Sequence, residues 1–305
     1  MRKMGLLFIM GVVLLASVSY GQEKDAEESE PLFPVRQNGK HGYIDRTGKI
    51  VIEPQFDSAW SFREGLGAVK IDGKWGYIDR TGKIVIKPQF DNAYPFSAGL
   101  AGVMIGGKWG FVDKTGKIII EPQFDWAFDF SEGLAGAKIG DKWGYIDKTA
   151  KIVIEPQFDR AQVFSEGLAP VEIDGEWGFI DKTGKMIISP QFDLAWWFSE
   201  GLAPAKIGGK WGYIDKTGEY AINPQFDYAH HLSEGLAAVQ IGTTFDERGR
   251  FVGRNWGFID KTGRYVINPQ FDWAGRFFKG VAGVKIGAKW GWIDKTGKYI
   301  WEPTE

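Results

Sequence analysis

The chain has 305 residues, with 37 Lys and Arg against 39 Asp and Glu, a formal net charge of −2, and 44% hydrophobic residues. This balance provides no basic stripe of the kind that binds nucleic acid, so we expect no nucleic-acid partner. There is no cysteine, which excludes disulfides, a thiolate metal site, a cysteine nucleophile and lipid attachment to cysteine. The 42 Gly, 22 Phe and 14 Trp residues indicate many tight turns between packed aromatic side chains.

The first 21 residues have the pattern of an export signal. Two basic residues precede an apolar run at 5–16, and the small-x-small sequence at 19–21 is typical of a cleavage site. The run of twelve residues is too short for a comfortable membrane span. We therefore predict a signal peptide at 1–21 and a mature chain without an integral membrane span, located in the periplasm, on the outer surface or in the medium. The acidic, polar stretch at 22–30 is predicted to be a flexible leader.

From residue 31 to 305 the chain repeats a 34-residue pattern, most clearly at 142–175. A Trp-Gly pair marks each copy, and His41-Gly42 replaces it in the first of eight copies. A fixed period of this length indicates a solenoid, a propeller or another array. We interpret the repeated Trp as a structural contact between neighbouring copies rather than a ligand platform, because an aromatic side chain buries about 150–250 Å². These structural residues are Trp75, Trp109, Trp143, Trp177, Trp211, Trp256 and Trp290.

Each copy contains three strand signals, seen at 66–71, 74–79 and 84–86. The Asp-Gly pair between the first two predicts a hairpin with a primed turn. A second turn places Gly at a left-handed position in seven copies, and Ala150 replaces it in the other, so we expect strained backbone at Ala150.

A proline follows the third strand signal of each copy, as at Pro88, and should end that strand or lie on an unpaired edge. The Asp-x-Ala-x-x-Phe stretch that comes next is compatible with one capped helical turn. One copy carries eleven additional residues near 243–253. We interpret this insertion as a lengthened first hairpin, which either belongs to a binding face or is a tolerated expansion.

The recurring patterns Lys-Trp-Gly-Tyr/Phe-Ile-Asp-Lys-Thr-Gly-Lys, Pro-Gln-Phe-Asp and Phe-Ser-Glu-Gly-Leu-Ala resemble the WG-repeat family, named for its Trp-Gly pair. The resemblance covers residues 31–305, with departures in the first and last copies. It implies a bacterial, often exported β-repeat protein. It implies no common enzymatic activity and no shared ligand.

We predict an all-β tandem array of eight three-stranded copies and favour an open solenoid or superhelical stack. The alternative is a β-propeller of seven or eight blades, but blades usually have four strands and about 40 or more residues. No split copy is present to close a ring, and the altered end copies are typical of the caps of an open stack.

The sequence contains no catalytic constellation, so we predict that the protein is not an enzyme and has no cofactor. The histidines, His41, His230 and His231, have no regular spacing to carboxylates, and we expect surface or packing roles rather than a metal site. Residues 102–108 approach a phosphate-binding loop. Trp109 stands where Ser or Thr is required, however, and the context is a hairpin.

The three variable positions of Asp-x-Ala-x-x-Phe carry many aromatic residues, where surface drift would give polar ones. We interpret them as a candidate binding face with aromatic anchors, the alternative being that they fill gaps between copies. The candidate face comprises Trp60, Tyr94, Trp126, Phe128, Trp196, Trp197, Tyr228, His230, His231 and Trp273.

These observations favour an exported, non-catalytic scaffold that binds another envelope or extracellular protein. The alternative is a carbohydrate-binding array in which Trp and Tyr stack on sugar rings, with polar neighbours such as Asp129 and Arg276 binding the hydroxyl groups.

Overall fold

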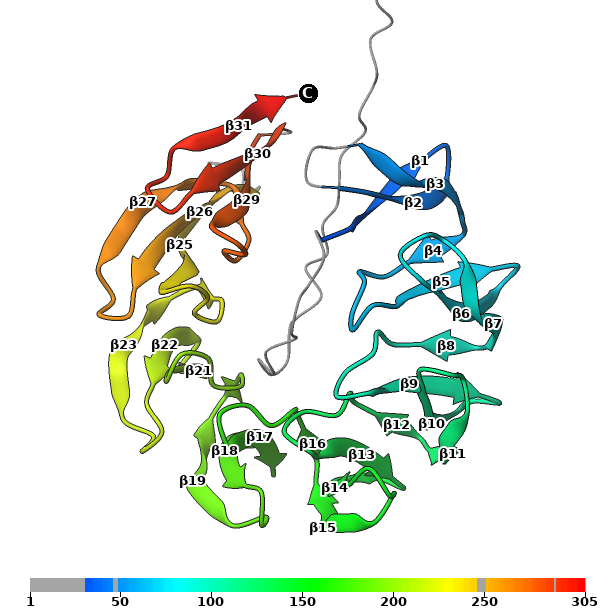
Figure 1. The fold of residues 1–305 in the computed structure, drawn as a ribbon. Helices are drawn as coiled ribbons and strands as arrows, with labels where there is room; N and C mark the ends of the chain where they lie inside the picture. The colour runs from blue at the N-terminus through cyan, green and yellow to red at the C-terminus, as the bar shows by residue number, and fades with distance from the viewer. Residues whose placement is uncertain (1–30, 46–48, 246–250, 288, 305) are drawn as a thin grey trace, which may run out of the picture. The chain divides into compact units, whose positions relative to one another are not determined.

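A computed structural model describes residues 31–45, 49–245, 251–287 and 289–304 (Figure 1). The predicted signal peptide, the acidic leader and the hairpin tip at 246–250 lie outside these described residues. The chain divides into two compact units, Met1–Val153 and Ile154–Glu305, called the N-terminal and C-terminal units below. All the secondary structure described is β-strand and turn, as the all-β prediction requires.

The first sheet has three antiparallel strands in chain order, namely β1 (Phe33–Gln37), β2 (Lys40–Ile44) and β3 (Ile50–Phe56). The next three sheets each have four strands, again in chain order. They comprise β4 (Ser58–Ala59), β5 (Gly67–Ile71), β6 (Lys74–Ile78) and β7 (Ile84–Phe90); β8 (Asn92–Ala93), β9 (Leu100–Ile105), β10 (Lys108–Asp113) and β11 (Ile118–Phe124); and β12 (Trp126–Ala127), β13 (Ala135–Ile139), β14 (Lys142–Ile146) and β15 (Ile152–Phe158).

The four sheets that follow belong to the C-terminal unit and have the same strand order. They comprise β16 (Arg160–Ala161), β17 (Leu168–Ile173), β18 (Glu176–Asp181) and β19 (Met186–Phe192); β20 (Leu194–Ala195), β21 (Ala203–Ile207), β22 (Lys210–Ile214) and β23 (Tyr220–Phe226); β24 (Tyr228–Ala229), β25 (Leu236–Phe245), β26 (Phe251–Asp260) and β27 (Tyr265–Phe271); and β28 (Trp273–Ala274), β29 (Val281–Ile286), β30 (Lys289–Asp294) and β31 (Tyr299–Thr304).

The Asp-x-Ala stretch is a short strand, and the prediction of a helical turn there is wrong. The amide of Asp57 donates to the carbonyl of Lys70, and the amide of Trp60 donates to the carbonyl of Ala68, both at 2.9 Å. The two-residue strand β4 thereby adds a fourth strand to the sheet beside β5. Two residues are too few to produce the alternation from which a strand is recognised in a sequence.

The fourth strand also changes the architecture. The open solenoid that we favoured is not supported, because its premise of three-stranded copies is wrong. Four-stranded antiparallel sheets connected in chain order have the strand number and order of propeller blades. They match the alternative, the β-propeller.

The Gly of the repeated Trp-Gly pair allows the proline-containing third strand to approach. Residues of β6 and β7 pair as Trp75 with Phe90 and as Tyr77 with Ile86, with a bulge between the two pairs. A Cβ atom on Gly76 would lie 2.5 Å from the carbonyl oxygen of Ile86, closer than any side chain tolerates. Pro88 lies on this edge strand, as expected, but the strand continues past it to Phe90 because the bulge accommodates the missing donor.

Both predicted turns form in the copies in which the structure describes them. Asp72 and Gly73, at φ 49° and 80°, make the tight turn between β5 and β6. In the second turn the Oδ1 atom of Asp79 accepts hydrogen bonds from the amide and hydroxyl of Thr81, at 2.9 and 2.6 Å. Ala150 occupies the left-handed position of its turn with φ 67°, where the equivalent Gly82 has φ 87°.

Successive sheets within a unit share their hydrophobic cores. In the N-terminal unit the ring of Phe96 lies 4.8 Å from the ring of Tyr77 in the preceding sheet. The hydroxyl of Tyr77 donates to the carbonyl of Tyr94 at 2.7 Å, and the hydroxyl of Ser97 donates to the carbonyl of Phe130 at 2.9 Å. These contacts recur one period apart, so the same residues that build one sheet also attach the next.

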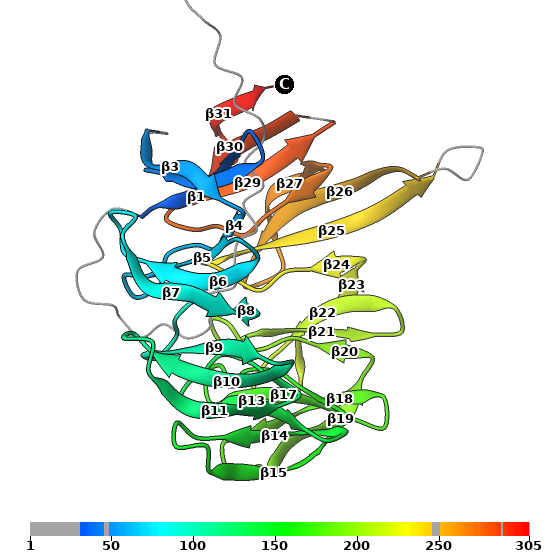
Figure 2. The ribbon, with the colours of Figure 1, turned by 90° about the vertical axis from the view of Figure 1, so that its right-hand side faces the viewer.

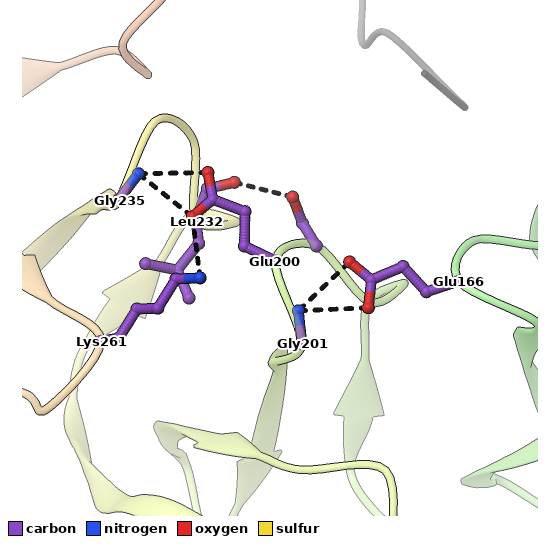
Figure 3. A network of polar contacts seen from close by, with 7 residues as sticks. Glu166, Glu200, Gly201, Leu232, Gly235 and Lys261 are labelled. Carbon is purple, nitrogen blue, oxygen red and sulfur yellow. Dashed lines mark hydrogen bonds and ion pairs between the residues drawn. The ribbon is translucent and has the colours of Figure 1, made fainter. Parts of the chain in front are cut away.

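A polar contact reinforces this stacking, and Figure 3 shows it in the C-terminal unit. The carboxylate of Glu200 accepts the amide of Gly235 through both oxygens at 3.1 Å, and Lys261 Nζ lies 3.2 Å from the same carboxylate. Glu166 binds the amide of Gly201 in the same way. We call this arrangement the Glu–Gly–Lys contact. Each such contact joins one sheet to the next.

The eleven-residue insertion lengthens one hairpin. Both β25 and β26 have ten residues, whereas the corresponding β21 and β22 have five each. Figure 2 shows β25 and β26 extending beyond the neighbouring strands of their unit. Their outer pairs, Thr244 with Gly253 and Phe245 with Phe251, continue the ladder after a register shift.

Candidate binding surface

The candidate residues lie in and directly after the two-residue strands, and the three variable positions have different surroundings. We call them the first, second and third positions of Asp-x-Ala-x-x-Phe. The sequence alone does not distinguish the three positions, whereas in the structure the side chains at each position contact different residues.

Second-position side chains stack on the repeated Trp of their own sheet. The ring of Tyr94 lies 4.4 Å from that of Trp109 with the planes 10° apart. The remaining aromatic pairs of this kind are Trp60 with Trp75, Phe128 with Trp143, Trp196 with Trp211, and His230 with Trp256. Because the repeated Trp side chains of these pairs are buried, the second position extends the core and is only half-buried itself.

First-position side chains are the most accessible of the three. Trp126 is 45% exposed, and Arg160 is also exposed, whereas Tyr228 and Trp273 are half-buried. The ring of Trp126 lies 5.8 Å from that of Trp109 in the preceding sheet. Trp109 therefore contacts both the second position of its own sheet and the first position of the next.

The same arrangement recurs in the C-terminal unit. The ring of Tyr228 lies 5.7 Å from that of Trp211, whose other neighbour is Trp196 at 6.2 Å. Tyr228 also contacts His230 at 5.3 Å and Trp256 at 5.7 Å. In the last sheet, Trp273 lies 5.1 Å from Trp290. Within each unit, the aromatic side chains of the candidate face therefore contact the repeated Trp residues as well as one another.

Third-position side chains are the most enclosed in the C-terminal unit. The imidazole of His231 stacks on the indole of Trp197 at 3.9 Å with the planes 18° apart. Its Nδ1 atom lies 3.1 Å from the carbonyl oxygen of Trp197. Both side chains are buried, so they serve the packing between two successive sheets.

The two histidines are held neutral by their surroundings. Burial lowers the pKa of His230 to about 4, and the positive charge of Arg276 acts in the same direction. Burial lowers the pKa of His231 well below its usual value, again with a contribution from Arg276. Both imidazoles are therefore neutral and pack against aromatic rings.

A carboxyl group with an unusual environment lies at the third position in the N-terminal unit. The Oδ1 atom of Asp129 is shielded from solvent and has no hydrogen-bond partner among the described residues. Burial raises the pKa of Asp129 to about 7, and the charge of Arg63 opposes this shift in part. This carboxyl is poorly placed to bind the hydroxyl groups of a sugar, the role that the sequence suggested for it.

The remaining predicted positions carry no additional chemistry. His41 takes the place of a repeated Trp and pairs with Arg36 in the ladder of β1 and β2. No group of three or more His, Asp or Glu side chains within the described ranges could hold a metal ion. No helix in the part of the chain that the structure describes has the length and hydropathy needed to cross a membrane.

A protein-family model described as a WG containing repeat matches the chain seven times. The matches cover residues 42–75, 75–109, 109–143, 143–177, 177–211, 211–242 and 256–290. No curated protein matches the chain.

Solved structures with a similar fold have little sequence in common with this chain. One is a eukaryotic initiation factor, with 11% identity and a TM-score of 0.54, covering 90% of this chain and 96% of that one. Another is the dihydro-heme d1 dehydrogenase NirN in complex with DHE. It has 12% identity and a TM-score of 0.56, and the match covers 95% of this chain and 77% of that one. At such identities the likeness concerns the fold alone.

Proposed function

The chain belongs to the WG containing repeat family, and we propose that it is a non-catalytic scaffold, built as an eight-bladed propeller, that binds another protein in the cell envelope. Each copy keeps the residues that build and attach its sheet and changes the residues at the three variable positions. Such a division suits a repeat protein that presents a broad, varied surface to a large partner.

The observation that carries the proposal is the exposure of two first-position side chains, Trp126 and Arg160, while the other first-position side chains are half-buried. In each unit we call the first-position residues the first-position surface; they are Ser58, Asn92 and Trp126 in the N-terminal unit and Arg160, Leu194, Tyr228 and Trp273 in the C-terminal unit. Each follows the same Asp and precedes the same Ala, and each belongs to or adjoins a two-residue strand in the same place in its sheet. Trp126, at 45% exposure, is a large apolar side chain of the kind that anchors protein interfaces.

A photo-crosslinking experiment tests the protein partner. A photoreactive phenylalanine analogue replaces Trp126 in the exported protein, and the crosslinked envelope protein is identified and purified. The affinity of that protein for the unmodified chain is then compared with its affinity for Trp126→Ser. Truncating a hot-spot Trp should weaken binding by about 2 kcal/mol or more, roughly thirtyfold. Val85→Ser is the matched control because Val85 is 43% exposed on the edge strand β7. Equal affinities of all three chains would exclude the first-position surface.

Location outside the cytoplasm is the second part of the proposal, and its support is the export pattern of residues 1–21. N-terminal sequencing of the protein recovered from the cell envelope or medium tests it. Cleavage after Gly21 should give a mature chain that begins with Gln22. Recovery of the uncleaved chain from the cytoplasm would contradict export.

Carbohydrate binding is the second candidate, favoured by the exposed indole of Trp126 beside Trp109. Sugar rings stack on such faces, but they also need accessible hydrogen-bonding groups, and Asp129 is shielded. A glycan array probed with the purified chain separates the two classes. A blank array removes the sugar proposal, whereas binding that is lost in Trp126→Ser would replace the protein proposal with it.

A further inference from the structure

Among the described residues, no strand pairs with β1 along the edge where the other sheets have their two-residue strand. In the seven four-stranded sheets, a two-residue strand pairs with the strand that corresponds to β1. In the first sheet β1 is itself an edge strand, and among the described residues it pairs with β2 alone. This sheet therefore offers main-chain groups in the place where its neighbours hold a fourth strand.

The register identifies which main-chain groups are available. In the second sheet, Lys70 and Ala68 accept hydrogen bonds from the amides of Asp57 and Trp60, the two residues that flank β4. Lys70 and Ala68 pair across the hairpin with Trp75 and Tyr77. In β1 the equivalent residues are Arg36, which pairs across the hairpin with His41, and Pro34, which pairs with Tyr43. The carbonyl groups of Arg36 and Pro34 are thus the equivalent acceptors.

Proline at this place does not prevent a fourth strand. The equivalent residue is Pro170 in one sheet and Pro204 in another. The amide of Gln162 donates to the carbonyl of Pro170, and the amide of Trp196 donates to that of Pro204, both at 3.0 Å. Only the carbonyl takes part, so the missing N–H of Pro34 is of no consequence.

Side chains of β1 are also more exposed than their equivalents in β5. Phe33 and Pro34 are half-buried, whereas the equivalent Gly67 and Ala68 are buried. Arg36 is exposed, whereas Lys70 is half-buried. An added strand would cover Phe33 and Pro34 in part and remove apolar surface from water.

A site for a carboxylate adjoins this edge. In other sheets the Asp before the two-residue strand accepts a hydrogen bond from the tight turn, as from the amide of Gly106 to Asp91 Oδ2 at 2.8 Å. The amide of Asp174 donates to Asp159 Oδ2 at 2.9 Å. The turn of the first sheet has the same backbone conformation, with φ 49° at Asn38 and 81° at Gly39, against 49° and 80° at Asp72 and Gly73. The Asn38 amide is therefore set to receive such a carboxylate.

We propose that the edge of β1 that no described strand occupies binds an extended segment of a partner polypeptide with the pattern Asp-x-Ala-aromatic. The segment completes the first sheet as its fourth strand. Its Asp accepts the turn amide at Asn38, and its main chain donates to Arg36 and Pro34. Seven Asp-x-Ala segments fill the equivalent place in the other sheets, and four of them continue with an aromatic residue, namely Trp60, Tyr94, Phe128 or Trp196, which defines the occupant. This site is separate from the first-position surface, and neither proposal depends on the other.

The test uses the full mature chain and a capped peptide, Asp-Trp-Ala-Phe-Asp-Phe, that copies residues 125–130. A fluorescent label reports binding, and a photoreactive group at the second residue reports the contact by mass spectrometry. Main-chain addition of a short strand should give a Kd on the order of 100 μM, with crosslinks to β1 (33–37) or its turn.

Two altered peptides serve as controls. Methylation of the fourth amide nitrogen keeps every side chain but removes the donor equivalent to the amide of Phe128, which binds Gly136 at 2.9 Å. Affinity should fall at least about tenfold. Replacement of the first Asp by Lys should weaken binding to a similar degree. Absence of binding at about 1 mM peptide, equal binding of the methylated peptide, or crosslinks confined to other sheets would overturn the proposal.

Discussion

The Glu–Gly–Lys contact is missing its carboxylate at Ala98, and restoring it should stabilise the N-terminal unit. Ala98 has φ 53°, close to 49° at Glu64 and 54° at Glu200, so its backbone already suits the motif. Lys148 Nζ binds the carbonyl of Ala98 at 2.6 Å and therefore lies near the place of a new carboxylate. In Ala98→Glu the carboxylate should accept the amide of Gly133 and pair with Lys148.

The expected gain follows from the contacts of the natural copies. The carboxylate of Glu64 accepts the amide of Gly99 at 3.1 and 3.2 Å and pairs with Lys114 at 3.0 Å. A hydrogen bond to a charged group contributes roughly 1.5–3 kcal/mol, and an exposed ion pair adds at most about 1 kcal/mol. Ordering the Glu side chain costs roughly 1.5–2 kcal/mol. The net stabilisation is therefore about 1 kcal/mol, or a rise of roughly 2–4 °C in melting temperature.

Calorimetry of matched variants separates the parts of the contact. Ala98→Gln keeps the hydrogen bond and lacks the charge, so it should gain less than Ala98→Glu. The difference between the two should shrink in 1 M salt, because an exposed ion pair is screened there. The reverse change, Glu200→Ala, should lower the melting temperature by a similar amount. If Ala98→Glu melts no higher than the wild type and Glu200→Ala melts no lower, the contact contributes nothing and the reasoning fails.

Three further variants test the strained turn and the two buried titratable groups. Ala150→Gly relieves a left-handed alanine and should stabilise by about 0.5 kcal/mol after the entropy of glycine is counted; a lower melting temperature in calorimetry would refute strain at φ 67°. The pKa of Asp129 is raised to about 7, above its unfolded value of about 4, so its contribution to stability falls as pH rises between these values. Asp129→Asn should therefore melt higher than the wild type at pH 8 but not at pH 4, and equal gains would contradict this. The pKa of His230 is lowered to about 4, so the unfolded chain binds more protons as pH falls from about 6.5. His230→Phe places here the residue type found at Phe128, and it should reduce the fall in unfolding free energy that urea unfolding measures as the pH is lowered. An unchanged fall would show that other groups cause it.

Short-range chemistry made the strands and turns of each copy predictable. Asp72-Gly73 requires positive φ at both positions, and few structures other than a tight hairpin use it. The left-handed position of Ala150 followed from the glycines in the other copies. Pro88 indicated an edge strand because it cannot donate to a ladder. These inferences needed only neighbouring residues and the period.

The features that were missed depend on contacts between distant residues. Strand β4 is too short for any periodicity, and only its hydrogen bonds to Lys70 and Ala68 reveal it. Without this strand the copies appeared three-stranded, which led to the solenoid. The sequence also did not reveal that first-position side chains are the most accessible and that second-position side chains stack on the repeated Trp. The stacking of Tyr94 on Trp109 across the sheet had no sequence signal beyond the aromatic composition of the second position.

The even spacing of the contacts between sheets has an evolutionary consequence. Ser97 reaches Phe130 over 33 residues, and Glu64 reaches Gly99 over 35, so each contact joins one copy to the next. The groups that meet are the same in most pairs of neighbouring copies, with exceptions such as Ala98, which stands where other copies have Glu. Recombination between copies of the gene segment can therefore exchange one variable triplet for another while the attachment of the sheets is preserved. New combinations of surface residues become accessible in single genetic steps, without passing through misfolded intermediates.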